Sequence, residues 1–193
     1  MMTKKSAIRD ILWTLLFAVV AFLMLRASVQ TVRVDMASME PTIQPGWWIM
    51  LNKVSYHFTD PKRGDIVVFD SPINSGQDLI KRVIGLPGDT VEVKNNTVFV
   101  NGVPLQEPYV AIPPHYTMAP ETIPAGQYFV LGDNRDVSID SHYGWLVPRD
   151  KLVGRAWIVI WPPSKWGKAP NYPQLVNRTA PDSPQGVAAL ATR

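Results

Sequence analysis

A serine and a lysine in two separate segments could together break a peptide bond. Ser38 begins Ser-Met-Glu-Pro-Thr (38–42), directly after a strand-like run, where a rigid element would leave its hydroxyl free. Lys81 lies within Leu-Ile-Lys-Arg-Val-Ile (79–84), whose apolar side chains would lower the pKa of the amine. A neutral amine can accept the proton of a serine hydroxyl. Each residue alone has an ordinary alternative, a turn hydrogen bond for Ser38 and a solvent-facing position for Lys81.

Residues 132–144 form a third candidate segment, because carboxylates, hydroxyls and an arginine are crowded into a short stretch. Such a density builds a hydrogen-bonded loop that could hold a neighbouring amine in place, and a polar surface loop is the alternative. Ser141 and His142 stand beside Asp140 in this segment. A Ser–His–Asp triad is assembled by the fold rather than by adjacency along the chain, so we expect no triad here.

The elements that must position these residues are predicted to be strands. Short apolar runs bounded by Gly, Pro, Asn or Asp follow one another along the chain, and no stretch between residues 30 and 160 keeps a helical period. Asn95-Asn96 between two valine-rich runs predicts a hairpin turn, and residues 103–125, with six prolines, predict a loop. The runs are 32–34, 47–51, 66–69, 79–84, 91–93, 98–100, 128–131 and 156–160.

An apolar segment precedes these strands. Ile11 to Leu25 carries no charge and a single polar residue, Thr14. Residues 8–29 as a helix would span about 33 Å, enough to cross a membrane. More basic residues precede the segment than follow it, which favours a cytoplasmic N-terminus. A removable signal peptide and a buried core helix are the alternatives.

Composition excludes several classes of site. The chain has 193 residues and no cysteine, so disulfides, thiolate metal sites and Cys nucleophiles are excluded. Eighteen prolines argue against a helical bundle. Three scattered histidines lack metal-ligand spacing, and a net charge of +3 gives no reason to expect a nucleic-acid partner. We predict a cytoplasmic N-terminus (1–7), an anchor (8–29), a β-rich catalytic domain (30–161) with a small β/loop insertion (90–124), and a disordered Pro-rich tail (162–193).

Four motifs in fixed order behind the apolar segment resemble bacterial type I signal peptidases, up to about residue 161. They are Ser-Met-x-Pro-Thr at 38–42, Gly-Asp-Ile-Val-Val-Phe at 64–69, Lys-Arg-Val-Ile-Gly-x-Pro-Gly-Asp at 81–89, and Gly-Asp-Asn-Arg-x-x-Ser-x-Asp-Ser at 132–141. The resemblance implies an antiparallel β-sheet catalytic domain with one N-terminal transmembrane helix. It also implies a serine endopeptidase that removes signal peptides from exported preproteins at the outer face of the cytoplasmic membrane.

The resemblance assigns roles to individual residues. Ser38 is expected to be the nucleophile, with its backbone N–H in the oxyanion hole, and Lys81 the general base. Ser138 is expected to orient the lysine, and Asp140 to belong to the supporting network of the loop. No metal or cofactor is implied, and the expected partners are preproteins and membrane lipid.

The resemblance also implies that the substrate lies as an extended strand between two segments of the enzyme, with small residues at positions −1 and −3. The residues expected to bind it are Val32, Val34, Met36, Met39, Asp78, Leu79 and Ile80.

Two positions depart from the family pattern. Met36 stands where many members have Ser or Gly, so a second, side-chain oxyanion donor is missing. His142 stands where an Arg often accompanies the loop aspartate, so we expect a His142–Asp140 pair to brace the loop instead.

Three other functions were weighed. A self-cleaving repressor would need a DNA-binding helix pair at the N-terminus, and a eukaryotic-type signal peptidase would have His in place of Lys81. A catalytically weak or inactive anchored β-module that binds extended peptides is the main alternative. The lost donor at Met36 favours this alternative, whereas the presence of Ser38, Lys81 and Ser138 opposes it.

Overall fold

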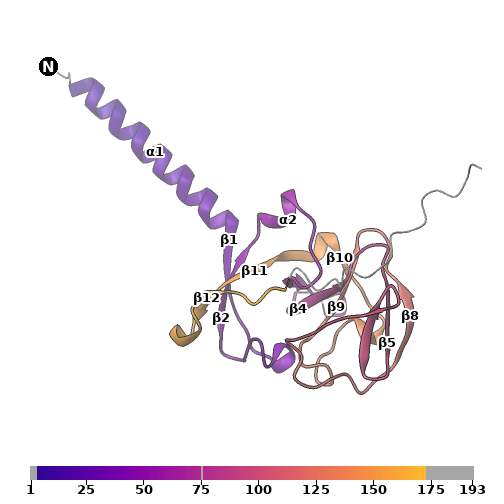
Figure 1. Ribbon diagram of the computed structural model, residues 1–193. Coiled ribbons are helices and arrows are strands. Elements are labelled where there is room, and N and C mark those ends of the chain that lie inside the picture. Colours follow the sequence, from indigo (N-terminus) through magenta and orange to yellow (C-terminus); the bar gives the residue numbers. More distant parts are fainter. Residues whose placement is uncertain (1–3, 75, 173–193) are drawn as a thin grey trace, which may run out of the picture.

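The computed structural model describes residues 4–74 and 76–172. One long helix, α1 (Lys4–Ser28), leads into twelve short strands in two antiparallel sheets (Figure 1). The prediction of an antiparallel β domain behind one N-terminal apolar helix is confirmed.

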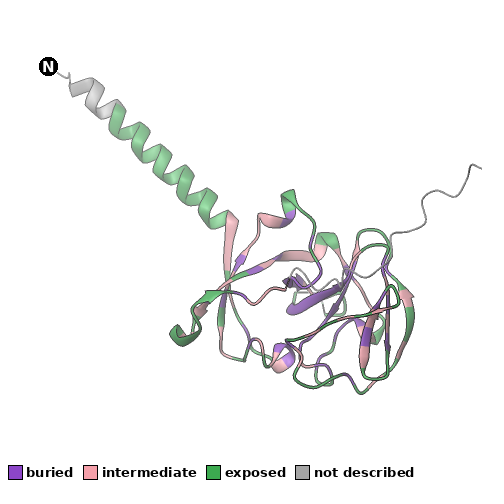
Figure 2. Cartoon of the chain, in the orientation of Figure 1, coloured by how far each residue is buried: buried purple, intermediate pink, exposed green. Residues whose placement is uncertain are grey.

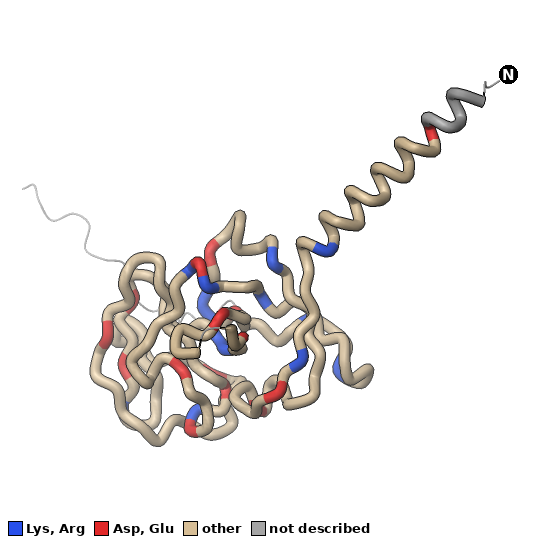
Figure 3. Tube along the Cα trace, turned by 180° about the vertical axis from the view of Figure 1, so that it is seen from behind, with Lys and Arg blue, Asp and Glu red and all other residues tan. Residues whose placement is uncertain are grey.

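α1 stands apart from the β domain. The side chains of residues 10–27 are all exposed (Figure 2), although most of them are apolar. The sequence has no charged residue between Asp10 and Arg26. Figure 3 accordingly shows most of the helix as an uninterrupted tan stretch. Asp10–Ser28, with a mean hydropathy of 2.1, is long and apolar enough to cross a membrane.

The larger sheet carries the segments that resemble catalytic motifs. Its β1 is an edge strand that pairs only with β2 on this path, and β12 pairs with β11. In spatial order the strands are β1 (Val29–Arg33), β2 (Trp48–Asn52), β11 (Leu152–Trp161), β3 (Ile66–Asp70), β4 (Asp78–Gly85), β9 (Gln127–Leu131) and β10 (Val147–Pro148), with β12 (Gly167–Lys168) beside β11.

The smaller sheet lies within the segment predicted to be an insertion. Its order is β7 (Val103–Pro104), β6 (Thr97–Val100), β5 (Thr90–Lys94) and β8 (Met118–Thr122). Asn95 and Asn96 have φ of 51° and 58° and connect β5 to β6, as a two-residue hairpin turn requires. Val91, Val93 and Ile123 pack against Ile84 and Phe129, so the two sheets share an apolar core.

The remaining helices are short. They are α2 (Ser55–Phe58) and the 3₁₀ turns η1 (Ala37–Met39), η2 (Ser141–Tyr143), η3 (Arg149–Lys151) and η4 (Pro163–Lys165). Met39 and Ile43 are fully buried in a second core cluster with Val34, Ile49 and Leu51. This packing fixes the turn that contains Ser38, because the residues on both sides of it are tied to the core.

The predicted start of the disordered tail is wrong. Residues 162–172 form η4, β12 and a segment, 169–172, that packs on the domain; we call this segment the C-terminal strap. Ala169 is buried, the Asn171 side chain accepts the Ile66 N–H at 2.7 Å, and the Tyr172 N–H donates to the Gly64 carbonyl at 3.0 Å. Composition missed the strap because hydrogen bonds and the ring contacts of Tyr172, rather than a run of large apolar side chains, hold it. The rest of the predicted tail, 173–193, lies outside the described residues.

Candidate active site

The nucleophile candidate Ser38 lies in η1, which follows the edge strand β1 after residues 34–36. Its side chain is almost completely buried. The loop of residues 132–143, here called the catalytic loop, holds its backbone from the other side. The Asn134 N–H donates to the Ser38 carbonyl at 3.0 Å, and the Asn134 side-chain amide donates to the Ala37 carbonyl at 3.2 Å.

Lys81 meets Ser38 although the two residues are 43 positions apart in the chain. Lys81 lies in the middle of β4, opposite Val67 of β3, and its side chain is 1% exposed. Its Nζ donates to Ser38 Oγ at 2.8 Å. The structure therefore brings together the two residues that the sequence proposed as a reacting pair.

The electrostatic setting of Lys81 favours the neutral amine. Burial lowers its pKa from 10.5 to about 8, because the charged form loses its hydration. The negative charges of Asp140 and Asp133 act in the opposite direction and raise this pKa, but less strongly. A useful fraction of Lys81 is thus unprotonated near neutral pH.

Asp140 is fully buried and organises the catalytic loop. Its Oδ2 accepts the Gly132 N–H at 2.8 Å, and its Oδ1 lies 2.7 Å from His142 Nδ1. The His142 ring stacks on Tyr116, with centroids 4.0 Å apart and planes at 15°. His142 is therefore close to Asp140, as expected, and its ring position is fixed by an aromatic neighbour from the insertion.

Ser138 is buried beside Ser38 and makes no hydrogen bond to Lys81. Its Oγ has no hydrogen-bond partner among the described residues. A Cβ on Gly132 would lie 2.3 Å from Ser138 Oγ and 2.4 Å from the Ser38 carbonyl oxygen. Only glycine can stand between these two serines at such close approach.

Arg82, next to Lys81 in β4, ties that strand to the catalytic loop. Its guanidinium pairs with both carboxylate oxygens of Asp133, at 2.8 and 2.7 Å, and both side chains are fully buried. It also donates to the carbonyl oxygens of Gly64 and Pro170, the latter in the C-terminal strap. Tyr109 covers its face, with the guanidinium carbon 4.0 Å from the ring centroid.

Residues 107–116, part of the proline-rich segment, contact the catalytic loop. We call them the insertion arm. Glu107 accepts two hydrogen bonds from Arg135, whose Nε donates to the Gly132 carbonyl at 3.1 Å. His115 contacts Asp136 through its backbone N–H and its ring. Sequence reasoning missed Glu107, Tyr109 and Tyr116, because nothing in their local pattern distinguishes them from other loop residues.

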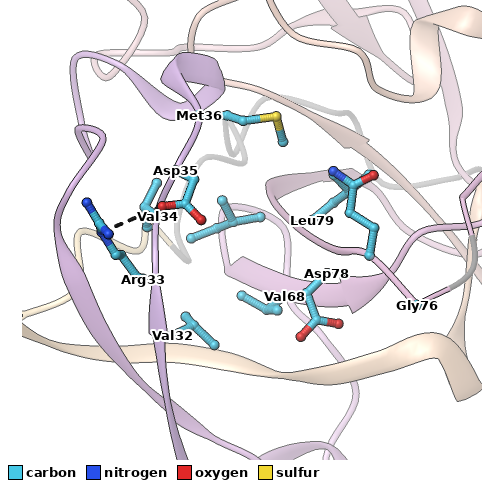
Figure 4. A pocket seen from close by; sticks show the side chains of 11 residues that line it. Val32, Arg33, Val34, Asp35, Met36, Val68, Gly76, Asp78 and Leu79 are labelled. Carbon is cyan, nitrogen blue, oxygen red and sulfur yellow. Dashed lines mark ion pairs between the residues drawn. The ribbon is translucent and has the colours of Figure 1, made fainter.

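Two connected hollows lead to the dyad. The dyad pocket, of about 390 Å³, is lined by Met36, Ala37, Ser38, Ser71, Ile73, Asn74, Gln77, Leu79, Lys81, Val137 and Ile139. The outer groove, of about 480 Å³, is lined by Val32, Arg33, Val34, Asp35, Met36, Val68, Gly76, Gln77, Asp78, Leu79 and Ile80 (Figure 4). Both hollows share Met36, Gln77 and Leu79, so they form one path.

The outer groove contains six of the seven predicted substrate-binding residues. Val32 and Val34 face Asp78 and Leu79 across it, with Met36 at one end, in Figure 4. The placement of Met39 was wrong. Its side chain is fully buried in the core and lines neither hollow, because it follows Ser38 on the inward face of η1.

The walls of the outer groove have free strand edges. The Val34 N–H donates to Trp47, and the Val34 carbonyl accepts from Gly46, so this residue faces β2. Arg33 and Asp35, which alternate with it, direct their backbone groups toward the groove. On the opposite wall, residues 78–80 pair with β3, whereas pairing with β9 begins only at Arg82. An extended peptide could pair with both edges.

Comparison with known proteins gives the site its context. The family profile described as "Signal peptidase, peptidase S26" matches residues 8–161. Among the described residues, no cluster of His, Asp or Glu could hold a metal ion.

Several similar proteins are named as signal peptidases. "Probable signal peptidase I-2" of Synechocystis sp. is 45% identical over 160 residues, 80% of this chain and 73% of its own. "Signal peptidase IB" of Staphylococcus aureus (strain COL) is 34% identical over 181 residues, which cover 84% of this chain and 94% of that protein. A crystal structure of signal peptidase I from Enterococcus faecalis V583 is 38% identical, with a TM-score of 0.45, and covers 50% of this chain and 97% of that one. The matched profile and these relatives show that the chain belongs to the signal peptidase family, peptidase S26, the serine endopeptidases that remove signal peptides.

Proposed function

We propose that the chain cleaves signal peptides with Ser38 as nucleophile and Lys81 as general base. The 2.8 Å contact between Lys81 Nζ and Ser38 Oγ is the observation that carries this proposal. Neutral Lys81 takes the hydroxyl proton as Ser38 Oγ attacks the scissile carbonyl, and it then gives the proton to the leaving amine. Neutral Lys81 then deprotonates a water molecule, which attacks the acyl-enzyme. The acyl group leaves, and the proton returns to Ser38 Oγ.

Charge on the scissile oxygen would be stabilised by few donors. The Ser38 backbone N–H is the donor that the resemblance assigns, and the thioether of Met36 supplies no N–H or O–H beside it. Ser138 would accept a hydrogen bond from Lys81 once the lysine leaves Ser38, since its buried hydroxyl is otherwise unpartnered. Asp140 and His142 would keep the catalytic loop in position during these steps.

The substrate would lie extended in the outer groove and pair with both free edges. Alternate side chains then face the apolar floor formed by Val32, Val34, Val68 and Ile80, with small residues at −1 and −3. The preprotein is held in the same plane as the enzyme when α1 crosses the membrane, which raises their effective concentration. The basic residues at the start of α1, ahead of its apolar stretch, favour a cytoplasmic N-terminus and a catalytic domain outside the cytoplasmic membrane.

Cleavage of a purified preprotein by the full-length enzyme in detergent tests the dyad. We expect Ser38→Ala and Lys81→Ala to lower kcat/KM by at least about 10³-fold, because each removes a group that reacts. Ser164→Ala and Lys94→Ala, outside the two hollows, are matched controls and should leave kcat/KM unchanged. Substantial cleavage by either dyad variant would refute the assignment. Tight binding of preprotein without cleavage by the wild type would instead favour the inactive peptide-binding module.

A further inference from the structure

Three large apolar side chains are exposed around the dyad. Val137 and Ile139, in the catalytic loop, are 63% and 58% exposed, and Ile73, in the segment after β3, is 52% exposed. All three line the dyad pocket, which also contains Ser38 and Lys81. Single exposed apolar residues are common on protein surfaces, but three that gather in one hollow indicate a surface that binds a partner.

The burial pattern of the catalytic loop directs two of these side chains outward. Ser138 and Asp140 are buried, whereas Val137 and Ile139, which alternate with them, are exposed. A loop position that faces water is usually occupied by a polar residue. Here both outward positions carry branched apolar side chains, and both line the hollow that contains the dyad. Their apolar character is explained by what this hollow holds, since side chains so exposed do not contribute to the packing of the loop.

The larger sheet places these side chains on two sides of Lys81. The strand that carries Lys81, β4, pairs with β3 along one edge and with β9 along the other. Ile73 follows the end of β3, whereas Val137 and Ile139 follow the end of β9. Both neighbours are antiparallel to β4, so the segments that follow them leave the sheet in the same direction. The dyad pocket therefore has two apolar walls, here called the β3 wall (Ile73) and the loop wall (Val137 and Ile139).

The dyad pocket continues the path of the substrate beyond the scissile bond. The outer groove, which would hold the residues before the bond, contains neither Ser38 nor Lys81. The dyad pocket shares Met36 and Leu79 with this groove and contains both members of the dyad. A peptide whose −1 carbonyl reaches Ser38 therefore has its next residues, +1 and +2, in the dyad pocket. Neighbouring side chains of an extended peptide point to opposite sides, so +1 and +2 meet opposite walls.

We propose that the two walls form an apolar clamp for the first two residues of the mature protein, so that the enzyme prefers apolar side chains at +1 and +2. This inference rests on the proposed function and deepens it. An apolar side chain between the walls is removed from water, which is favourable. A charged side chain at the same place loses part of its hydration, and the walls offer it no counter-charge. Selection after the bond is thus determined by side chains that take no part in the reaction.

A set of soluble peptides with a constant sequence before the bond measures this preference. Positions +1 and +2 are varied one at a time among Leu, Ala, Asp and Lys, and kcat/KM is measured with the full-length enzyme in detergent. We expect Leu to exceed Asp and Lys by about tenfold at each position, with Ala between them. The segment after the bond leaves when the acyl-enzyme forms, so its contacts act on kcat/KM. Rates that agree within about twofold for all four residues would overturn the clamp.

A charge placed in either wall should change the preference. Ile139→Lys puts a cation in the loop wall and Ile73→Lys puts one in the β3 wall, so each variant should prefer Asp over Lys by about tenfold at one position. The two variants should act on different positions, because the walls face opposite sides of the peptide. Ile112→Lys is the matched control. Ile112 is 59% exposed but lines neither hollow, so this variant should keep the wild-type order of preference. If both wall variants keep that order, or act on the same position, the clamp is wrong.

Val137→Thr gives a second measurement that does not introduce a charge. The substitution keeps the shape of the side chain but adds a hydroxyl, so the ratio of the rates with Leu and Asp should fall to about threefold at the position that meets the loop wall. Each ratio compares two peptides cleaved by the same variant, so a general loss of activity cancels. An unchanged ratio at both positions would contradict the loop wall.

The wild-type enzyme separates the two levels of the proposal. The peptide with Ala at both positions needs the dyad but gains little from the clamp. A wild type that cleaves no peptide of the set and no preprotein would remove the proposed function itself. Cleavage of the Ala peptide without discrimination at +1 and +2 would remove the clamp alone.

Discussion

At the scale of single residues, the proposed mechanism makes the reaction depend on the protonation of Lys81. The buried amine has a pKa of about 8, and only its neutral form can accept the Ser38 proton. We therefore expect kcat/KM for a soluble peptide to rise almost tenfold per pH unit below about pH 8 and to level off above it. A pH–rate profile of the full-length enzyme in detergent measures this rise, the acidic limb of the profile. An acidic limb centred near the usual pKa of an exposed lysine would contradict the burial of Lys81.

The same profile tests the part played by Asp140. Its negative charge raises the Lys81 pKa, so Asp140→Asn should shift the acidic limb to lower pH. The maximum rate should also fall, because an amide cannot accept from both Gly132 and His142 as the carboxylate does. Asp136→Asn is the matched control. Asp136 pairs with His115 and is not among the charges that shift Lys81, so its variant should keep the wild-type limb.

At the scale of elements, the catalytic loop depends on contacts from both sides. The insertion arm contacts the catalytic loop through Glu107 and Tyr116. The C-terminal strap contacts Arg82, which pairs with the loop, through Pro170 and Tyr172. These two elements have little regular structure of their own. Their function is to keep the loop, and with it Ser138 and Asp140, against the dyad.

Glu107→Gln tests the contribution of the insertion arm. Arg135 has no exposed side-chain surface, so losing the carboxylate leaves a buried guanidinium without its counter-charge. We expect the free energy of unfolding to fall by roughly 3 kcal/mol, measured by thermal melting of the purified enzyme. Glu92→Gln removes the partner of half-exposed Lys94 and should cost less than about 1 kcal/mol. Equal losses in the two variants would show that the arm does not hold the loop.

The sequence predicts the reacting residues far better than it predicts these supports. Ser38 and Lys81 stand in local patterns that are unusual enough to be noticed, and the strand-like apolar runs place Lys81 on a strand and Ser38 shortly after one. Glu107 is 28 residues from Arg135, and Pro170 is 88 residues from Arg82. No local pattern encodes such contacts, and the strap in particular has a composition typical of a disordered tail. The misplacement of Met39 has the same origin, since the turn that directs it inward is set by tertiary packing.

At the scale of the whole molecule, burial of Lys81 lowers the stability of the fold. Lys81 would have a pKa of 10.5 in the unfolded chain and has one of about 8 in the native domain. Protonation is therefore less favourable in the folded state, and this difference corresponds to about 3 kcal/mol of lost stability. The cost is fully present below about pH 8 and disappears as the pH rises toward 10.5. Many other contacts, including the Arg82–Asp133 pair, must compensate for it.

Lys81→Met should therefore stabilise the enzyme while abolishing its activity. The substitution keeps an apolar chain of similar length in β4 but removes the buried charge. We expect its free energy of unfolding near pH 7 to exceed that of the wild type by up to about 3 kcal/mol, and the gap to shrink steadily between about pH 8 and 10. Thermal unfolding of both full-length proteins in detergent, followed by near-ultraviolet circular dichroism, measures the difference in their free energies of unfolding at each pH. Ser38→Ala abolishes the same reaction but leaves Lys81 in place, so its stability should keep the pH dependence of the wild type. A Lys81→Met gap of the same size at both ends of this pH range would show that burial of the charge is not what lowers the stability.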